Sequence, residues 1–241
     1  MGLNPTPFEY LTFDGKNSAD FGVWISGGGT YNAPARDVEM VSVPGRNGDI
    51  SYDNGRFQNV AVTYPAFISR KFQHRIDDFR GWMCSHIGYK RLEDTYHPEE
   101  YRLAMYKSGL DVTTTPRNLA GSFDLTFECK PQRFLKSGEV PTEFTAAGKI
   151  YNPTYYPAKP LIRCYGTSGS VTVGGVSVAV TGASEYVDID CELMEVYEGS
   201  TFRNSTTTLT NGEFPVIEPG EVDVSFTGFS TIEITPNWYM I

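Results

Sequence analysis

The sequence lacks the features that mark several large classes of protein. No run of about 18 apolar residues occurs, which excludes a membrane-spanning helix. Residues 1–7 show neither the basic start nor the apolar stretch of a secretory signal, so we expect synthesis in a cytosol. The 20 Lys and Arg are outnumbered by 29 Asp and Glu, and phosphate neutralisation needs the opposite balance. We therefore expect no sequence-specific binding of nucleic acid.

Signatures of catalysis and of metal binding are also missing. The cysteines show no C-x-x-C spacing, so we expect them to be reduced and mostly buried rather than metal ligands. No G-x-S-x-G elbow occurs, and the triple glycine at 27–29 lacks the spacing of a phosphate-binding loop. His74, His86 and His97 have no triad-like motif around a serine and suit surface or cap roles. The expectation is a protein that is not an enzyme and has no cofactor.

One acidic pair leaves an alternative open. Asp188 and Asp190 are two residues apart in a predicted strand, so their side chains share a face and could bind a hard cation. A solvated strand face is the commoner role for such a pair.

What is abundant in the sequence favours β-structure. The chain has 24 Gly, 15 Pro, 15 Tyr and 15 Phe, a turn-rich and aromatic-rich composition that dilutes the strong helix formers. One amphipathic helix is predicted over about residues 69–86, because apolar side chains recur there at helical spacing, with Ser69 as its N-cap and Gly88 just past its end. The rest of the chain reads as short strands.

Alternation and turn residues locate those strands. Strands are predicted at 8–13, 21–25, 38–43, 60–68 and 121–130, with turns at 44–49 and 53–56 and a hairpin over 89–108. In the second half, Gly174-Gly175 joins two alternating strands into a hairpin over 170–180. Further short strands are predicted at 186–190, 193–197, 222–226 and 231–235, the spacing of a sandwich.

Length, proline content and charge divide the chain into two domains. A proline-containing, linker-like stretch over 131–160 places the boundary near Ser137, giving domains at 1–137 and 138–241. Residues 1–135 carry 15 basic and 16 acidic side chains, whereas residues 136–241 carry 5 and 13. Nearly all of the net charge of −9 therefore lies in the second domain, which suggests that the two halves face different surroundings.

A series of motifs resembles the distal tail proteins of siphophages over nearly the full length. In the first half it comprises residues 21–30, the VPGRNGD turn at 43–49 and DNGRF at 53–57 leading into the strand at 60–67. In the second half it comprises 151–154 with 160–162, the pair at 188 and 190 ahead of 194–197, and 212–215 followed by 219–220. Each motif is weak alone, and their order and spacing carry the resemblance.

The resemblance implies a fold and a role. The first domain is expected to be a β-sandwich or split-barrel with one α-helix that builds a homo-hexameric ring, and the second a galectin-like β-sandwich that projects outward. The ring would join the tail tube protein to the tail-tip or baseplate proteins and to a receptor-binding protein. The expected location is the virion tail, after synthesis in the bacterial host cytoplasm.

Two sets of residues are the candidates for contacts. Those for contacts between ring neighbours or with other tail proteins are the triple-glycine loop and the following turn: Gly27, Gly28, Gly29, Pro44, Gly45, Arg46, Asn47, Gly48 and Asp49. Those for a ligand or partner are the aromatics Tyr151, Tyr155, Tyr156 and Trp238. The same aromatics support a rival hypothesis, a lectin-like protein that binds a sugar of the host surface.

Overall fold

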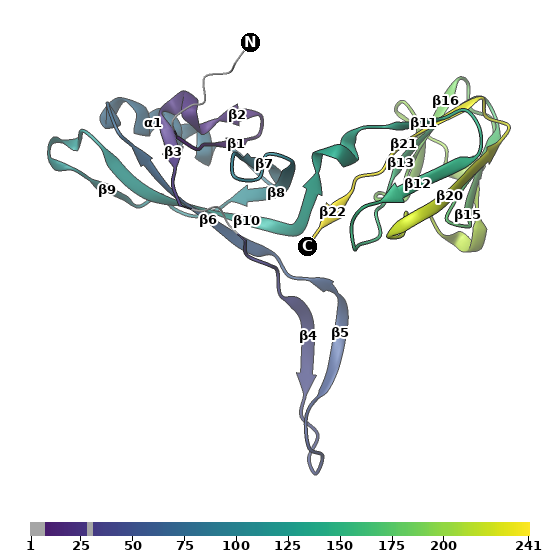
Figure 1. Ribbon diagram of the computed structural model, residues 1–241, viewed down its shortest axis with the longest axis horizontal. Coiled ribbons are helices and arrows are strands. Elements are labelled where there is room, and N and C mark those ends of the chain that lie inside the picture. Colours follow the sequence, from purple (N-terminus) through teal and green to yellow (C-terminus); the bar gives the residue numbers. More distant parts are fainter. Residues whose placement is uncertain (1–7, 28–30) are drawn as a thin grey trace. The chain divides into compact units, whose positions relative to one another are not determined.

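The chain folds as two compact units that separate between Arg133 and Phe134. The computed structural model describes residues 8–27 and 31–241, and β-strands predominate in both units (Figure 1). The division lies close to Ser137, where the sequence predicts the domain boundary. The single α-helix found among the described residues belongs to the first unit.

A twisted sheet forms the centre of the first unit. Its main strand order is β2-β1-β7-β8-β10-β6-β3, and β9 pairs with β10 beside that path. The strands of this unit are β1 (Leu11–Phe13), β2 (Lys16–Asn17), β3 (Val23–Ile25), β4 (Arg36–Val41), β5 (Ile50–Phe57), β6 (Val60–Ile68), β7 (Lys90–Asp94), β8 (Glu100–Tyr106), β9 (Val112–Thr114) and most of β10 (Gly121–Leu135). Short 3-10 turns occur at η1 (Ser18–Phe21) and η2 (Pro116–Asn118).

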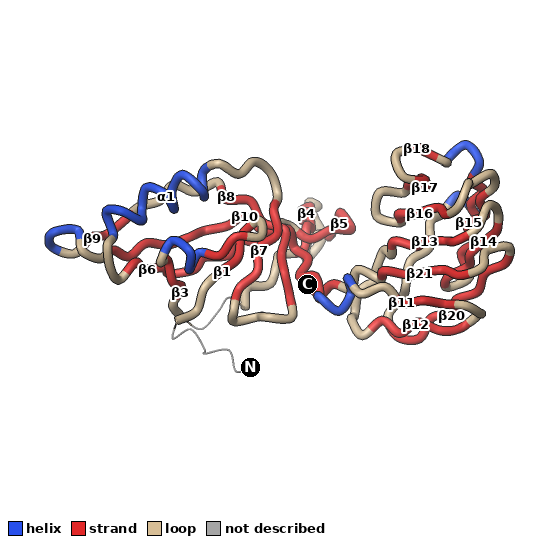
Figure 2. The backbone as a smooth tube through the Cα atoms, turned by 90° about the horizontal axis from the view of Figure 1, so that it is seen from above, coloured by secondary structure: helices blue, strands red, loops and turns tan. Residues whose placement is uncertain are grey.

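Alternation along β6 and β10 builds the core of this unit. The two strands pair antiparallel, with Val62 opposite Phe127 and Tyr64 opposite Leu125, and these four side chains are buried. Successive strand residues point to opposite faces, so the residues between them lie on the other side of the sheet. The helix α1 (Phe72–Cys84) covers the buried face, where Phe79 packs in the same cluster (Figure 2).

The helix begins later than the sequence predicts. The strand β6 continues to Ile68, and Lys71 takes a left-handed conformation with φ 55° that redirects the chain, so the first helical turn starts at Phe72. Ser69 is therefore not the N-cap. The helix ends at Cys84, where the Ser85 hydroxyl donates to the Trp82 carbonyl oxygen at 2.7 Å. No helix in the described part of the chain has the length and apolarity needed to cross a membrane.

Two facing sheets form the second unit. One has the order β11-β21-β13-β16-β17-β18 and the other β12-β20-β14-β15-β19. The strands of these two sheets are β11 (Thr142–Phe144), β12 (Gly148–Asn152), β13 (Leu161–Tyr165), β14 (Gly169–Val173), β15 (Val176–Val180), β16 (Tyr186–Asp190), β17 (Glu195–Glu198), β18 (Thr201–Phe202), β19 (Thr207–Leu209), β20 (Gly220–Thr227) and β21 (Thr231–Thr235). The last strand, β22 (Tyr239–Met240), pairs with β10 instead. Short 3-10 turns are η3 (Lys136–Glu139), η4 (Asn204–Thr206) and η5 (Thr210–Gly212).

The sandwich core lies between these sheets and uses the predicted hairpin. Val171, Val173, Val178 and Ile189 are fully buried in one cluster with side chains from both sheets. Gly174 and Gly175 have φ of 60° and 85° and close the β14–β15 hairpin, as the sequence predicts, because only glycine takes two such conformations at little cost.

The linker predicted over 131–160 is wrong. The strand β10 runs to Leu135, and β11 and β12 both lie within that stretch. Pro141 directly precedes β11 and Pro153 directly follows β12, so these prolines mark strand ends, where a missing backbone N–H costs no ladder hydrogen bond. The prolines in this stretch therefore mark where strands begin and end, and they do not mark a linker between domains.

The cysteines are free, and three of the four are buried, in line with the sequence expectation. Burial raises the pKa of the thiols of Cys129, Cys164 and Cys191 to about 12, whereas Cys84 is exposed at the end of α1. Because the thiolate is the reactive form, the buried three should be inert near neutral pH.

Alkylation tests this difference. Treating the native protein with iodoacetamide at mildly alkaline pH should give one adduct, at Cys84, and denaturation should expose the other three. Peptide mass mapping identifies the modified residue. Adducts on Cys129, Cys164 or Cys191 at a rate comparable to that of Cys84 would contradict the packing described here.

Candidate functional site

The strands β4 and β5 form a two-stranded sheet of their own, which extends away from the main sheet of the first unit (Figure 1). We call residues 36–57 the arm. Almost every side chain of the arm is exposed, including six large apolar ones, which are Val38, Met40, Val41, Val43, Ile50 and Tyr52. An isolated two-stranded sheet is marginally stable in water, so such an arm needs a surface to pack against.

Apolar side chains occur on both faces of the arm. Val38 lies opposite Asp53 and Met40 opposite Ser51 on one face. Val41 lies opposite Ile50 on the other face, together with Tyr52. Met40 keeps 59% of its surface exposed. Packing against a single surface would cover only one of these faces, so the pattern suits an arm enclosed on two sides.

Ion pairs hold the base of the arm. The Arg56 guanidinium contacts the Asp37 carboxylate at 2.6 Å and holds the pKa of Asp37 below its usual range. The pKa of Asp53 is also lowered, chiefly because its carboxylate accepts a hydrogen bond from the Gly55 backbone N–H and also because it contacts Arg36. These pairs are exposed, so they contribute little stability each and mainly fix the register.

The turn predicted at 53–56 is wrong, because this segment is a bulge inside β5. The pairing passes from Val38–Asp53 to Arg36–Phe57, so the β5 strand contains extra residues between the paired ones. Gly55 has φ 71°, a conformation that an extra strand residue adopts most easily as glycine. The Asn-Gly dipeptide therefore correctly predicts a glycine with positive φ at this position. The chain does not reverse there, because the strand continues through the bulge.

The predicted contact residues of the turn lie at the free end of the arm. Pro44, Gly45, Arg46, Asn47, Gly48 and Asp49 are all exposed there, and Gly45 and Gly48 have positive φ. Gly27 follows β3 and has φ 101°, while Gly28 and Gly29 lie outside the described residues. The structure thus confirms that the turn lies on the surface. Its predicted contacts with ring neighbours or other tail proteins stay a prediction.

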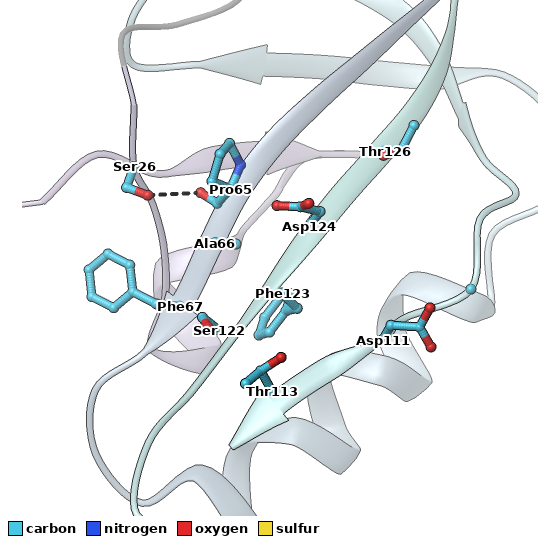
Figure 3. Close-up of a pocket in the computed structure, with 11 residues that line it drawn as sticks. Ser26, Pro65, Ala66, Phe67, Asp111, Thr113, Ser122, Phe123, Asp124 and Thr126 are labelled. Carbon is cyan, nitrogen blue, oxygen red and sulfur yellow. Dashed lines mark hydrogen bonds between the residues drawn. The ribbon is translucent and has the colours of Figure 1, made fainter. Parts of the chain in front are cut away.

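A polar groove of about 560 Å³ lies on the sheet face opposite α1 (Figure 3). Asp124 of β10 and Asp111, just before β9, line it together with hydroxyls that include those of Ser122 and Thr113. None of its lining residues is histidine, cysteine, lysine or arginine. The polar side chains of the groove are therefore hydroxyls and carboxylates, and the carboxylates repel phosphate groups.

Two of the three histidines, His86 and His97, make structural contacts, and His74 is exposed on α1. The His97 Nδ1 lies 3.2 Å from the Asp94 carboxylate, which also accepts a hydrogen bond from the Tyr64 hydroxyl at 2.7 Å. The His86 Nδ1 lies 2.8 Å from the Trp82 carbonyl oxygen at the end of α1. Within the described residues, no three His, Cys, Asp or Glu side chains gather closely enough to hold a metal ion.

The acidic pair Asp188 and Asp190 is engaged in the fold rather than solvated. Asp188 is 3% exposed and accepts two hydrogen bonds from Arg163, at 2.7 and 2.9 Å. Asp190 accepts from the backbone N–H groups of Glu192 and Leu193 and so shapes the turn after β16. Both carboxylates already have partners, so the cation site considered for the pair has no support.

The candidate aromatics divide into exposed and buried ones. Tyr155 is 91% exposed and Tyr151 is 66% exposed. Tyr156 stacks on Tyr239 with ring centroids 5.7 Å apart. Trp238 is 6% exposed and belongs to the sandwich core, so it is not the surface aromatic that the sequence suggested. It directly precedes the last strand and lies against Gly138, which explains why it is covered.

A buried asparagine, which belongs to the motif at 151–154 but was not among the candidate site residues, holds the loop that carries Tyr155. Asn152 is 1% exposed, and its amide nitrogen donates to the carbonyl oxygens of Tyr156 and Ile217, both at 2.9 Å. Its amide oxygen accepts from the backbone N–H and the hydroxyl of Thr154 at 2.9 and 2.8 Å. All four hydrogen bonds of the side chain are thus made, which fixes the loop.

Comparisons with known proteins identify the fold. No family model and no curated protein sequence matches this chain. Among solved structures, the crystal structure of the Dit (gp 19.1) protein of phage SPP1 matches with a TM-score of 0.77 and 14% identity, over 97% of this chain and 99% of that one. A chain of the phage P2 baseplate in its activated conformation with calcium matches at 0.50 and 12%, over 95% and 98%.

The match confirms the fold class predicted from the sequence, mainly β with one α-helix. It also confirms the resemblance of the chain to siphophage distal tail proteins at the level of the fold. Because it spans nearly the whole of both chains, it covers both units.

Replacing Asn152 with Ala should weaken the second unit. Several buried backbone and hydroxyl groups lose their partner, so we expect the free energy of unfolding to fall by about 2–3 kcal/mol, measured by urea denaturation. Asn47→Ala at the exposed end of the arm is the matched control and should change it by less than about 0.5 kcal/mol. Equal effects of the two changes would contradict the role given to Asn152.

The ion pairs of the arm should respond to acid. A carboxylate whose folded pKa is lowered stabilises the paired state above its unfolded pKa, and that contribution is lost as the pH falls through the folded value. We therefore expect the arm amides to lose hydrogen-exchange protection below about pH 4, while those of β6 keep it.

Carboxyl NMR titration provides the matched control. Arg56→Ala should raise the pKa of Asp37 toward 3.8, because the largest cause of its lowering is removed, whereas Arg46→Ala at the end of the arm should leave it in place. An unchanged Asp37 titration in Arg56→Ala would show that this ion pair does not form in solution.

Proposed function

We propose that this protein is a non-enzymatic, structural hub of a siphophage or prophage tail. In this role, six copies form a ring that joins the tail tube protein to tail-tip or baseplate proteins and to a receptor-binding protein. The observation that carries the proposal is the fold match over nearly the full length of the SPP1 Dit protein, which is described as a paradigm of the hub adsorption apparatus in phages that infect Gram-positive bacteria.

The arm supplies the physical basis for a ring. Fully burying one Val, Ile or Met side chain contributes about 1.5–3 kcal/mol, and the six large apolar side chains of the arm are only partly covered in the single chain. If the arm of each copy packs between its neighbours, each contributes several kcal/mol to assembly. Such a head-to-tail interface forms a closed ring when its rotation closes, and six copies is the proposed closure.

The two units have charges that suit different roles in such a ring. The first unit is nearly neutral, so six copies can pack closely without strong repulsion. The second unit, Phe134–Met240, holds 5 basic and 13 acidic side chains, a net charge of −8. We assign ring formation to the first unit and attachment of other tail proteins to the second.

The structure offers less to the lectin-like alternative than the sequence does. That hypothesis relied on exposed aromatics in the second unit, and Trp238 is buried in the core. Tyr156 is stacked on Tyr239 and only partly accessible. Tyr151 and Tyr155 remain exposed, and a protein partner suits them as well as a sugar does.

Native mass spectrometry tests the ring and the arm together. The wild-type protein should show a species of six times the 26.8 kDa chain mass. Val41→Lys with Ile50→Lys places two charges on one face of the arm and should weaken assembly by about tenfold or more, equivalent to ~1.4 kcal/mol.

Leu119→Lys is the matched control, because Leu119 is an exposed apolar residue of the same unit outside the arm. It should leave the oligomer unchanged. A monomer at every concentration would contradict the ring, and an equal loss in both variants would contradict the role of the arm.

A further inference from the structure

The strand β12 is one of the two edge strands of its sheet in the second unit, and β19 is the other. The strand β12 pairs with β20 on one side, and no other strand within the described residues pairs with it. An open edge presents backbone N–H and C=O groups that another extended chain can pair with. Figure 1 shows β12 beside β20.

The register identifies the backbone groups that face outward. The Asp223 carbonyl oxygen of β20 accepts a hydrogen bond from the Gly174 N–H at 3.1 Å, so the backbone of Asp223 points toward β14. Lys149, directly opposite Asp223, is therefore in a non-hydrogen-bonded pair. By alternation the same holds for Tyr151, and the N–H and C=O groups of Lys149 and Tyr151 face the open edge.

A fixed aromatic platform lies at the end of this edge. The Tyr151 side chain lies on the outer face of the strand, opposite Glu221. Tyr155 follows in the loop that Asn152 locks, and 91% of its surface is in contact with solvent. A rigid loop that exposes an aromatic side chain reduces the ordering cost of binding, and tyrosine is enriched among interface anchors.

The net charge of the second unit indicates which kind of peptide segment would bind at the β12 edge. Basic side chains of the second unit already contact carboxylates, among them Lys149, Lys159, Arg163 and Arg203. The unit keeps a large excess of acidic groups. Lysine on an edge strand commonly discourages pairing, but the Lys149 ammonium contacts Glu221 at 2.6 Å on the neighbouring strand and is partly neutralised there. A basic segment therefore complements this surface.

We propose that the β12 edge, defined by Lys149, Tyr151 and Tyr155, is a docking site for an extended, basic peptide segment of another tail protein. The segment adds as a strand beside β12, bonds to the outward backbone groups of Lys149 and Tyr151, and packs against the two tyrosines. That the segment belongs to another tail protein rests on the function proposed above. The open edge and its exposed tyrosines are features of the fold and do not depend on that function.

A selection from displayed random peptides against the full-length protein tests this site. Enriched peptides should carry a net positive charge, and the best one, made synthetically, should slow amide exchange at Lys149 and Tyr151 by about tenfold or more. No enrichment, or binding without protection of these two amides, would overturn the proposal. So would binding of soluble cell-wall glycans, in place of the peptides, at Tyr151 and Tyr155.

Two substitutions at one position separate backbone from side chain. Tyr151→Pro removes an N–H that bonds to no other described residue, and should weaken the peptide by about tenfold or more while the melting temperature stays close to that of the wild type. Tyr151→Thr keeps the N–H and should retain the protection of the Lys149 amide with a smaller loss of affinity. Equal binding to Tyr151→Pro and wild type overturns strand addition.

The outcomes also separate this proposal from the ring. Loss of peptide binding in a preparation whose native mass remains six chains contradicts the edge site and leaves the hub standing. A protein that stays monomeric but binds the peptide at β12 contradicts the hub and supports the edge site. If Tyr151→Pro does not fold, the exchange measurement on the wild type still decides the question.

Discussion

The hydrogen-bonded pairing of β6 with β10 determines which side chains of the first unit form its core, which line the groove and where the arm is anchored. Nine successive residue pairs, from Gly121–Ile68 to Cys129–Val60, fix one register. That register buries Val62, Tyr64 and Phe127 under α1 and leaves the alternate residues, Asp124 among them, on the open face that carries the groove. Since β5 leads into β6 within a few residues, the same ladder also anchors the base of the arm.

Function in this account comes from the parts of the strands that the fold leaves uncovered. Each unit has its own core, and in the second unit the buried polar groups of Asp188 and Asn152 have partners inside that unit. The arm leaves two faces uncovered, and β12 leaves one edge unpaired within the described residues. The proposed hub role requires uncovered surfaces of this kind, and the arm and the β12 edge provide them.

Sequence reasoning reached the fold class because the alternation along β6, β10 and the β14–β15 hairpin is a local signal. It missed what depends on tertiary context. The start of α1 at Phe72 depends on where β6 ends, and the burial of Trp238 depends on the segment around Gly138. The Asn-Gly at 54–55 gives the same local signal for a turn and for a bulge, and only the partner strand β4 separates them. Asn152 lies in the motif at 151–154, but the sequence did not indicate that its side chain would be buried and make four hydrogen bonds.

Burial of the arm between neighbouring copies is tested most directly by a cryo-electron microscopy reconstruction of the assembled protein. The account predicts a closed ring of six copies in which each arm is buried between neighbouring copies, with Met40 and Tyr52 in contact with them. A ring closed through other surfaces while the arms extend into solvent, or particles with no ring at all, would contradict it.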